Sequence, residues 1–207
     1  MIYIKSDKEI ELMRKPCQIV RDVLRLCEDK IKAGMTTKEL DKIAYDYITS
    51  CGAKPSFLGY GGFPAATCIS IDEQVVHGFP SDRIIEEDQI VSVDVGAYFN
   101  GFHGDAARSL YVGHISPEKK KLIDVTRECF FEGIKGICIG SALGDIGAQV
   151  QEHAEKNGFS VVRDMVGHGV GRNLHEDPSV PNYGRRGVGV RLKRNMTIAI
   201  EPMINMG

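Results

Sequence analysis

Two aspartates lie in a segment whose pattern is otherwise that of a β-hairpin, and they are the first sign of chemistry in this sequence. The segment runs from Val91 to Val112 and contains Asp94 and Asp105. A lone aspartate in a strand is usually exposed to solvent. Here the alternate positions are strongly apolar, so the strands are expected to pack on a core, where a carboxylate without a partner is costly. Two like charges close together need a cation or a shared proton. The hairpin therefore predicts a metal site.

The expected turn of this hairpin sets the distance between the two carboxylates. Asn100-Gly101 is a favoured dipeptide for a two-residue type I′ turn. With that turn, Asp94 and Asp105 become diagonal neighbours on one face, about 7–8 Å apart at the backbone. The residues that face them are small, Gly96 and Ala107. We expect the small residues to leave space for one or two cations between the carboxylates.

Further ligands are expected from two segments nearer the C-terminus. MVGHGVGRNLHEDP, residues 165–178, places His168 between two glycines and His175 seven residues later. A lone histidine is more often structural, but glycines beside it allow the backbone to approach a ligand or a metal closely. NMTIAIEP, residues 195–202, presents Glu201 at the end of a predicted strand. Two aspartates, a histidine and a glutamate suit Mn, Fe(II), Co or Zn with open positions, rather than a closed cysteine site.

Helices alternating with antiparallel strands are expected to position these residues, which indicates an α+β fold. Ser6 with Glu9 and Thr36 with Glu39 are capping boxes, which predict the starts of two helices. The second of these helices is expected to stop at Gly52. Two further helices are expected to begin at Ser116-Pro117 and near Leu143, and the last to stop at Gly158. The predicted strands are residues 66–71, the hairpin 90–112, residues 159–165 and residues 196–201.

The chain also repeats itself weakly, at an offset of 106 residues. Gly34, Glu39 and Gly52 of the first half correspond to Gly140, Asp145 and Gly158 of the second. So few matches can arise by chance. However, the same offset plus one carries Asp94 onto Glu201, so that a carboxylate falls at the same place in each half. We therefore expect a single catalytic domain, residues 1–207, with repeated halves of about 1–113 and 114–207.

Composition restricts the classes of function. The formal net charge of −2 gives no electrostatic footprint for nucleic acid or an anionic membrane. No apolar run approaches the ~18 residues of a membrane helix, and the charged N-terminus has no signal-peptide core. We expect a cytoplasmic protein without nucleic-acid specificity. Its 6 cysteines form no C-x-x-C pair and are interpreted as reduced thiols of the core or a pocket.

Taken together, the motifs resemble those of type I methionine aminopeptidases. They are HGFP at 77–80, VDVGAYFNGFHGDAARSLYVG at 93–113, GHGVGRNLHEDP at 167–178 and TIAIEPM at 197–203. The resemblance runs from the N-terminal helix to the last residue. It implies the pseudo-two-fold "pita-bread" fold, a curved antiparallel sheet covered by two pairs of helices. It also implies metal-dependent removal of the N-terminal methionine from nascent proteins, by hydrolysis of the first peptide bond.

The resemblance assigns a role to each candidate residue. The implied metal ligands are Asp94, Asp105, His168 and Glu201, and the complete family enzyme holds two divalent ions (Co, Mn, Fe(II) or Zn). The implied catalytic residues are His77, His175 and Glu201, with His77 and His175 beside the substrate. The implied methionine pocket consists of Phe57, Tyr60, Phe63, Cys68 and Leu174. Implied partners are the N-terminal methionine of nascent chains and the ribosome, and we expect a monomer.

The sequence departs from the family at its C-terminal end. Family members use a fifth ligand, a bridging glutamate near the C-terminus, and no such residue follows Glu201 before Gly207. We expect the C-terminal strands to be missing from this chain and its second half to be incomplete. We also expect these 207 residues alone to bind at most one metal ion well and to have little or no activity.

Two other functions fit parts of the pattern. A proline-specific aminopeptidase or prolidase shares the fold, but usually carries a large N-terminal domain. A non-catalytic binding module could have kept the fold and lost the metal because the C-terminal ligand is absent. Such modules normally lose their ligands by substitution, whereas the four ligands within range are intact here.

Overall fold

A computed structural model describes residues 1–207, and they fall into two compact units. The N-terminal unit consists of Glu9–Lys119 and Gly171–Leu174. The C-terminal unit consists of Met1–Lys8, Lys120–Val170 and His175–Gly207. Each unit therefore includes a short segment from a distant part of the sequence. The prediction of one catalytic domain stays a prediction.

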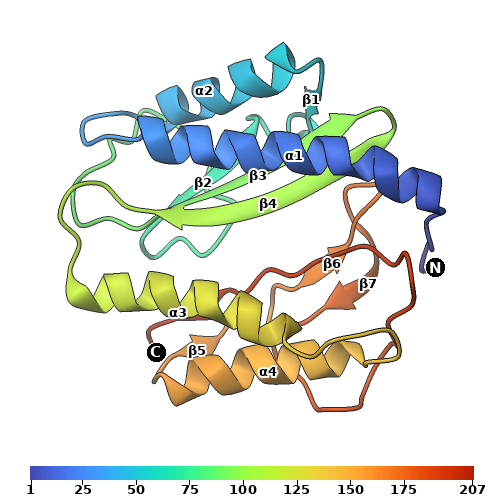
Figure 1. The fold of residues 1–207 in the computed structure, drawn as a ribbon. Helices are drawn as coiled ribbons and strands as arrows, with labels where there is room; N and C mark the ends of the chain where they lie inside the picture. The colour runs from blue at the N-terminus through green and yellow to red at the C-terminus, as the bar shows by residue number, and fades with distance from the viewer. The chain divides into compact units, whose positions relative to one another are not determined.

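Four helices and nine short strands make up the chain (Figure 1). The helices are α1 (Asp7–Lys30), α2 (Thr37–Ser50), α3 (Pro117–Ile134) and α4 (Leu143–Lys156). The strands are β1 (Lys54–Pro55), β2 (Thr67–Ile71), β3 (Val91–Phe99), β4 (Phe102–Leu110), β5 (Ser160–Val161), β6 (Gly167–Gly169), β7 (Glu176–Val180), β8 (Ile198–Ala199) and β9 (Ile204–Asn205). A single 3₁₀ turn, η1, covers Tyr60–Gly62. None of the helices has both the length and the apolar character needed to cross a membrane.

The N-terminal unit is an antiparallel sheet with α1 and α2 on one face (Figure 1). Strand β3 lies at its centre, paired with β1, β2 and β4. Val91, Val93 and Val95 of β3 are fully buried in the core that the helices cover. Each contributes about 1.5–3 kcal/mol of transfer free energy relative to an exposed side chain. The apolar face that the sequence predicts for this strand is therefore what attaches the hairpin to the helices.

The hairpin has the predicted turn and register. Asn100 and Gly101 both have positive φ, 48° and 88°, as a type I′ turn requires. Asp94 pairs with Ala107, and Gly96 pairs with Asp105. The two aspartates are thus diagonal neighbours on the same face of the sheet. The sequence prediction for this element is confirmed residue by residue.

Gly104 lets α1 lie directly on β4. A Cβ atom at this position would meet the carbonyl carbon of Pro16 at 2.5 Å and the backbone nitrogen of Cys17 at 2.6 Å. Backbone atoms at such distances cannot be avoided by a change of rotamer. The absence of a side chain at Gly104 therefore fixes the approach of the helix next to Asp105.

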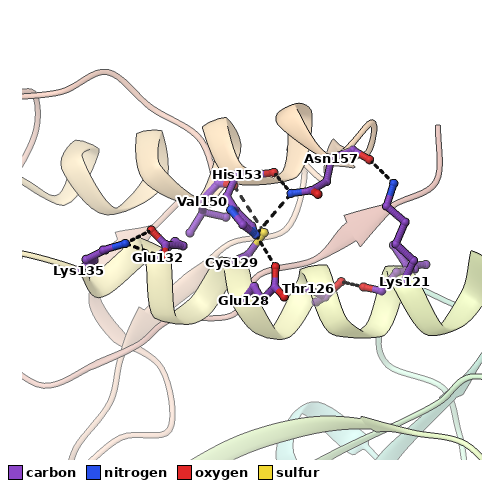
Figure 2. Close-up of polar contacts among 10 residues, drawn as sticks. Lys121, Thr126, Glu128, Cys129, Glu132, Lys135, Val150, His153 and Asn157 are labelled. Atoms are coloured by element: carbon purple, nitrogen blue, oxygen red, sulfur yellow. Dashed lines mark hydrogen bonds and ion pairs between the residues drawn. The ribbon is translucent and has the colours of Figure 1, made fainter.

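The C-terminal unit packs α3 and α4 together with two small sheets. The strand orders are β5-β9 and β7-β6-β8. Figure 2 shows side chains of α4 reaching toward α3: His153 contacts Glu128 at 2.9 Å. At the centre of this interface, the Cys129 thiol lies 3.6 Å from the carbonyl oxygen of Val150. Gly133 leaves room for Val150, whose Cγ2 would lie 2.7 Å from an added Cβ.

Equivalent hydrogen bonds in the two units support the internal repeat. In the N-terminal unit, the backbone N–H of Thr36 donates to Glu39 at 2.7 Å, at the start of α2. In the C-terminal unit, the backbone N–H of Ala142 donates to Asp145 at 2.7 Å, at the start of α4. The glycines two residues earlier also correspond, because the backbone N–H of Gly34 donates to Ile85 and that of Gly140 donates to Leu192, both at 2.9 Å. The second helix of each unit thus begins with the same hydrogen bond from backbone to carboxylate, although only Thr36 also accepts one through its side chain.

The strands near the C-terminus are shorter than the sequence predicts. Of residues 159–165, only Ser160–Val161 form a strand, and of residues 196–201, only Ile198–Ala199 do. Glu201 lies just beyond β8. Pro202 has no N–H to donate to a ladder, which favours ending the strand before it. The capping box expected at Ser6 remains a prediction, although α1 does begin at Asp7.

Candidate active site

His168 occupies the middle of the three-residue strand β6, where both neighbours must lack a side chain. A Cβ at Gly167 would lie 2.3 Å from the carbonyl oxygen of Ala199 in β8. A Cβ at Gly169 would lie 2.2 Å from the carbonyl oxygen of Asp177 in β7. The glycines thus have a steric role that the sequence interpretation did not include, and the predicted approach to a ligand or metal stays a prediction. They allow adjacent strands to approach the backbone, and the effect is to hold His168 between β7 and β8.

The two nitrogens of His168 have different surroundings. Nδ1 lies 2.8 Å from the carbonyl oxygen of Gly169, which can only accept a hydrogen bond. The neutral imidazole is therefore assigned a proton on Nδ1 and a lone pair on Nε2. Nε2 faces Oε1 of Glu201 at 3.1 Å. This is the arrangement of a metal-binding histidine, in which a hydrogen bond at one nitrogen orients the other.

Glu201 presents a buried oxygen that has no hydrogen-bond partner. Its Oε1 is within ion-pair distance of His168 Nε2, yet it makes no hydrogen bond. The short distance and the missing hydrogen bond agree if Nε2 of His168 and Oε1 of Glu201 are both hydrogen-bond acceptors. Two lone pairs then face each other with no proton between them. The backbone oxygen of Glu201 is held by the amide of Asn182 at 2.7 Å. The imidazole nitrogen and the carboxylate oxygen are both suitable ligand atoms for a divalent cation. Such a cation would also remove the cost of a buried oxygen without a hydrogen bond.

Asp94 and Asp105, the other two predicted ligands, lie in the N-terminal unit. Both are half-buried on one face of the hairpin. Asp94 of β3 pairs with Cys68 of β2. Burial raises the pKa of the Cys68 thiol to about 12, and the charges of Asp94 and Asp105 add to this effect. Cys17 is exposed, but partial desolvation of its thiol and then the charge of Asp105 also raise the pKa of that thiol. The hairpin face therefore carries the negative potential that a cation site needs.

The space beside Gly96 is not open, contrary to expectation. An added Cβ would meet the Cβ of Ser56 at 2.7 Å and the ring of Phe57 at 2.8 Å. The ring of His103 is hydrogen-bonded to Ser56 at 2.8 Å. Sequence spacing could not show that residues before β2 fill this space.

Four of the five residues predicted to bind methionine form one apolar cluster within the N-terminal unit. Phe57, Cys68 and Leu174 form a buried cluster, and Phe63 packs against it. Phe57 and Phe63 meet edge to face, with ring centroids 6.5 Å apart. Leu174 reaches the cluster because its segment, Gly171–Leu174, belongs to this unit. Tyr60 lies on the adjacent turn η1 and is 50% exposed.

His77 lies on a loop that is tied closely to β2. Its φ of 59° is in the left-handed region, which is uncommon for a residue with a side chain and often marks a functional site. A Cβ at Gly78 would lie 2.2 Å from the carbonyl oxygen of Ile69. Phe79 is 62% exposed and meets Phe63 at 5.2 Å between ring centroids. Sequence reasoning did not single out Phe79, although it belongs to the HGFP motif.

His175 lies in the C-terminal unit, with its ring close to that of His168. The centroids of the two rings are 4.2 Å apart, at an interplanar angle of 60°. His175 directly precedes β7, which pairs with β6. The C-terminal unit thus contains His168, His175 and Glu201, while the N-terminal unit contains the two aspartates and the apolar cluster.

Comparison with known proteins identifies the family. Residues 11–207 match the metallopeptidase family M24. The chain belongs to this family. Membership implies the use of a divalent metal, in agreement with the donors gathered in each unit.

Relatives within the family confirm the predicted function. The chain is 53% identical over 207 residues to methionine aminopeptidase from Clostridium perfringens, covering 100% of this chain and 83% of that protein. It is 45% identical to methionine aminopeptidase 1 from Bacillus subtilis, covering 100% of this chain and 84% of that protein. This family member is therefore a hydrolase of the methionine aminopeptidase type, as the motifs predict.

Solved structures confirm the α+β pita-bread fold. The crystal structure of methionine aminopeptidase from Rickettsia prowazekii matches with a TM-score of 0.98 and 42% identity, covering 100% of this chain and 84% of that one. The prolidase from Pyrococcus furiosus matches with a TM-score of 0.84 and 26% identity, covering 96% of this chain and 57% of that one. The similarity to the prolidase is weaker in both fold and sequence. The comparison therefore favours a methionine aminopeptidase over a proline-specific enzyme.

Proposed function

We propose that Asp94, Asp105, His168 and Glu201 together hold divalent metal, with the two units acting as one catalytic domain. The observation that carries this proposal is the pair of facing acceptors, His168 Nε2 and Glu201 Oε1, 3.1 Å apart. The chemistry of the four donors favours Mn, Fe(II), Co or Zn, with two ions per chain in the complete enzyme. When bound, such metal supplies Lewis-acid polarisation of a carbonyl and makes water more acidic.

The remaining chemistry belongs to the side chains. Besides its proposed role as a ligand, the carboxylate of Glu201 accepts the proton of the attacking water. His175 donates a hydrogen bond to the carbonyl oxygen as negative charge develops there. His77 hydrogen-bonds to the scissile amide and delivers a proton to the leaving amine. His77 then regains a proton from solvent, to which Glu201 releases the one that it took from the water. These roles use His77 and His175 as substrate-binding as well as catalytic residues.

The apolar cluster of the N-terminal unit binds the methionine side chain. Phe57, Cys68 and Leu174 supply buried walls, with Phe63 and Tyr60 at the outer side. Aromatic edges and a protonated thiol are soft, polarisable surfaces that suit a thioether. The pocket thus accounts for preference for methionine over a charged side chain.

The cellular setting follows from this substrate. The partners are nascent chains that begin with methionine, together with the ribosome that presents them. We propose that the enzyme acts as a monomer in the cytoplasm.

Titration with Mn(II) tests the metal site, with Glu201→Gln as the informative variant. Its control is Glu152→Gln, which makes the same change of charge at an exposed residue paired with Arg186. We expect the parent and the control to bind Mn(II) alike, and the Glu201 variant to bind at least about tenfold more weakly. Equal affinity in all three proteins would contradict the proposed ligand. The number of equivalents bound by the parent also decides between one ion and two.

Release of methionine from a Met-Ala-Ser peptide tests the reaction. We expect any release to require the added metal and to be abolished by EDTA and by Glu201→Gln, but not by Glu152→Gln. Release that persists in EDTA would exclude the proposed metal dependence. A metal-loaded parent that releases no methionine would count against the proposed reaction and would agree with the little or no activity that the sequence predicts for these 207 residues alone.

A further inference from the structure

A lysine near the N-terminus is buried in an ion pair beside the candidate site. The ammonium of Lys5 lies 2.6 Å from Oε2 of Glu176, and the two side chains are only 1% and 7% exposed. Lys5 Nζ also donates to the carbonyl oxygen of Tyr3 at 3.3 Å, and the Lys5 backbone donates to Asn195 at 3.1 Å. All these residues belong to the C-terminal unit. The N-terminal segment is therefore held in the C-terminal unit by a backbone hydrogen bond and by an ion pair.

A buried ion pair is not needed for stability alone. Removing two charges from water costs about as much as their attraction returns, and apolar residues of similar volume are often equally stable there. Such a pair does constrain geometry, because the ammonium of Lys5 without the carboxylate of Glu176 would be a buried charge with no opposite charge beside it. Lysine is among the residues least often found fully buried. The presence of Lys5 at this place therefore needs a reason other than core packing.

The position of Glu176 in the fold supplies that reason. Glu176 is the first residue of β7 and pairs with Gly169 across the ladder to β6. It directly follows His175, whose ring is 4.2 Å from that of His168 between centroids. His175 itself is exposed and lies just outside the strand, so its direction depends on where the strand begins. Fixing Glu176 fixes the backbone that carries His175.

We infer that Lys5 is a positioning residue: its ion pair with Glu176 anchors the start of β7 and so holds the ring of His175 beside His168. The inference rests on the proposed role of His175 at the carbonyl oxygen. Lys5 touches neither substrate nor reacting atoms in this account. Its effect is exerted through Glu176, and the N-terminal segment becomes part of the machinery that orients the site.

The test compares Lys5→Met, Glu176→Gln and the double variant with the parent protein. Asp7→Asn is the control, since it removes an ion pair from the same segment at side chains that are 72% and 73% exposed. The first readout is the nuclear Overhauser effect between the ring protons of His168 and His175 in the metal-free, histidine-labelled proteins. We expect this signal in the parent and in Asp7→Asn, and its loss in both single variants at a temperature where they remain folded.

The second readout is kinetic, on a Met-Ala-Ser peptide with Mn(II). We expect kcat to fall about ten- to hundredfold in each single variant, as for a catalytic group displaced by about 1 Å. KM and Mn(II) affinity should change by less than roughly threefold, because His175 acts on the transition state. The double variant should be no worse than the single ones, because the pair acts as a unit.

The outcomes separate this inference from the proposed function. A single variant with a lower melting temperature but an unchanged ring–ring signal and unchanged kcat would show a purely structural role and overturn the inference. A parent protein that releases no methionine would count against the proposed function. In that case the ring–ring signal alone still decides whether Lys5 positions His175.

Discussion

Replacing Gly104 by alanine probes how tightly α1 sets the position of the aspartate hairpin. The new Cβ would lie 2.5 Å from the carbonyl carbon of Pro16, whereas ordinary contact begins at 3.4 Å, so helix and strand must separate by about 0.9 Å. Overpacking of this kind costs about 1–3 kcal/mol of unfolding free energy. For a chain of this size, that corresponds to a fall in Tm of about 3–10 °C.

The same displacement should reach the metal site, because Asp105 is the next residue along β4. We expect Gly104→Ala to bind Mn(II) more weakly than the parent, by titration calorimetry, and to melt earlier, by circular dichroism. Arg108→Lys is a suitable control, since it changes a partly exposed side chain of the same strand and conserves the charge. A variant that melts within about 1 °C of the parent would refute the reasoning, because the cost predicted from the contact would then be absent.

The other predictions concern the pocket, the caps, the thiols and the metal. Leu174→Ala should lower the unfolding free energy by about 2–5 kcal/mol in urea denaturation, since Leu174 is only 2% exposed. The same variant should raise KM for a methionyl peptide, and an unchanged KM would show that methionine binds elsewhere. Hydrogen bonds from the backbone of Gly187 and Ala142 lower the pKa of Asp145 below 3.8, so its stabilising effect is complete above about pH 4 and is lost as the pH falls through the lowered pKa. Urea denaturation should therefore show Asp145→Asn to be less stable than the parent at pH 7, with the difference shrinking toward pH 2; a constant difference would contradict this. Burial raises the pKa of the Cys27 thiol to about 12, whereas Cys138 is exposed. Iodoacetamide at pH 8 should therefore label Cys138 before Cys27, as measured by mass spectrometry of the peptides. Early labelling of Cys27 would argue against its burial. Adding Mn(II) should raise Tm and EDTA should reverse the rise, whereas a non-catalytic module without metal would respond to neither.

Local patterns predicted the parts of the fold in which neighbours in sequence are neighbours in space. The register of Asp94 and Asp105 followed from Asn100-Gly101, because a two-residue turn determines every pair of the hairpin. The cap of α2 followed from Thr36 and Glu39 for the same reason. His168 and Glu201 were predicted as ligands from residue type and from family resemblance. Their facing nitrogen and oxygen atoms could be seen only in the structure.

The remaining features depend on contacts between distant segments. The side chains that fill the space beside Gly96 come from residues 56 and 57, which no pattern within the hairpin reveals. The burial of Lys5 depends on Glu176, which is 171 residues away in the sequence. A lysine close to the N-terminus would normally be assigned to the solvent-exposed surface. Tertiary packing, rather than local propensity, decides each of these features.

The strand that carries His168 also affects how sequence variation in this enzyme should be interpreted. Of its three residues, the histidine alone has a side chain, and the two glycines are excluded from variation by carbonyl oxygens 2.3 and 2.2 Å from any added Cβ. In a library randomised over residues 167–169, all three positions should tolerate almost no substitution. Only one of them would be intolerant because of chemistry. Survival scores or invariance at Gly167 and Gly169 would therefore measure steric exclusion, and folding assays without metal or substrate should reproduce them in full.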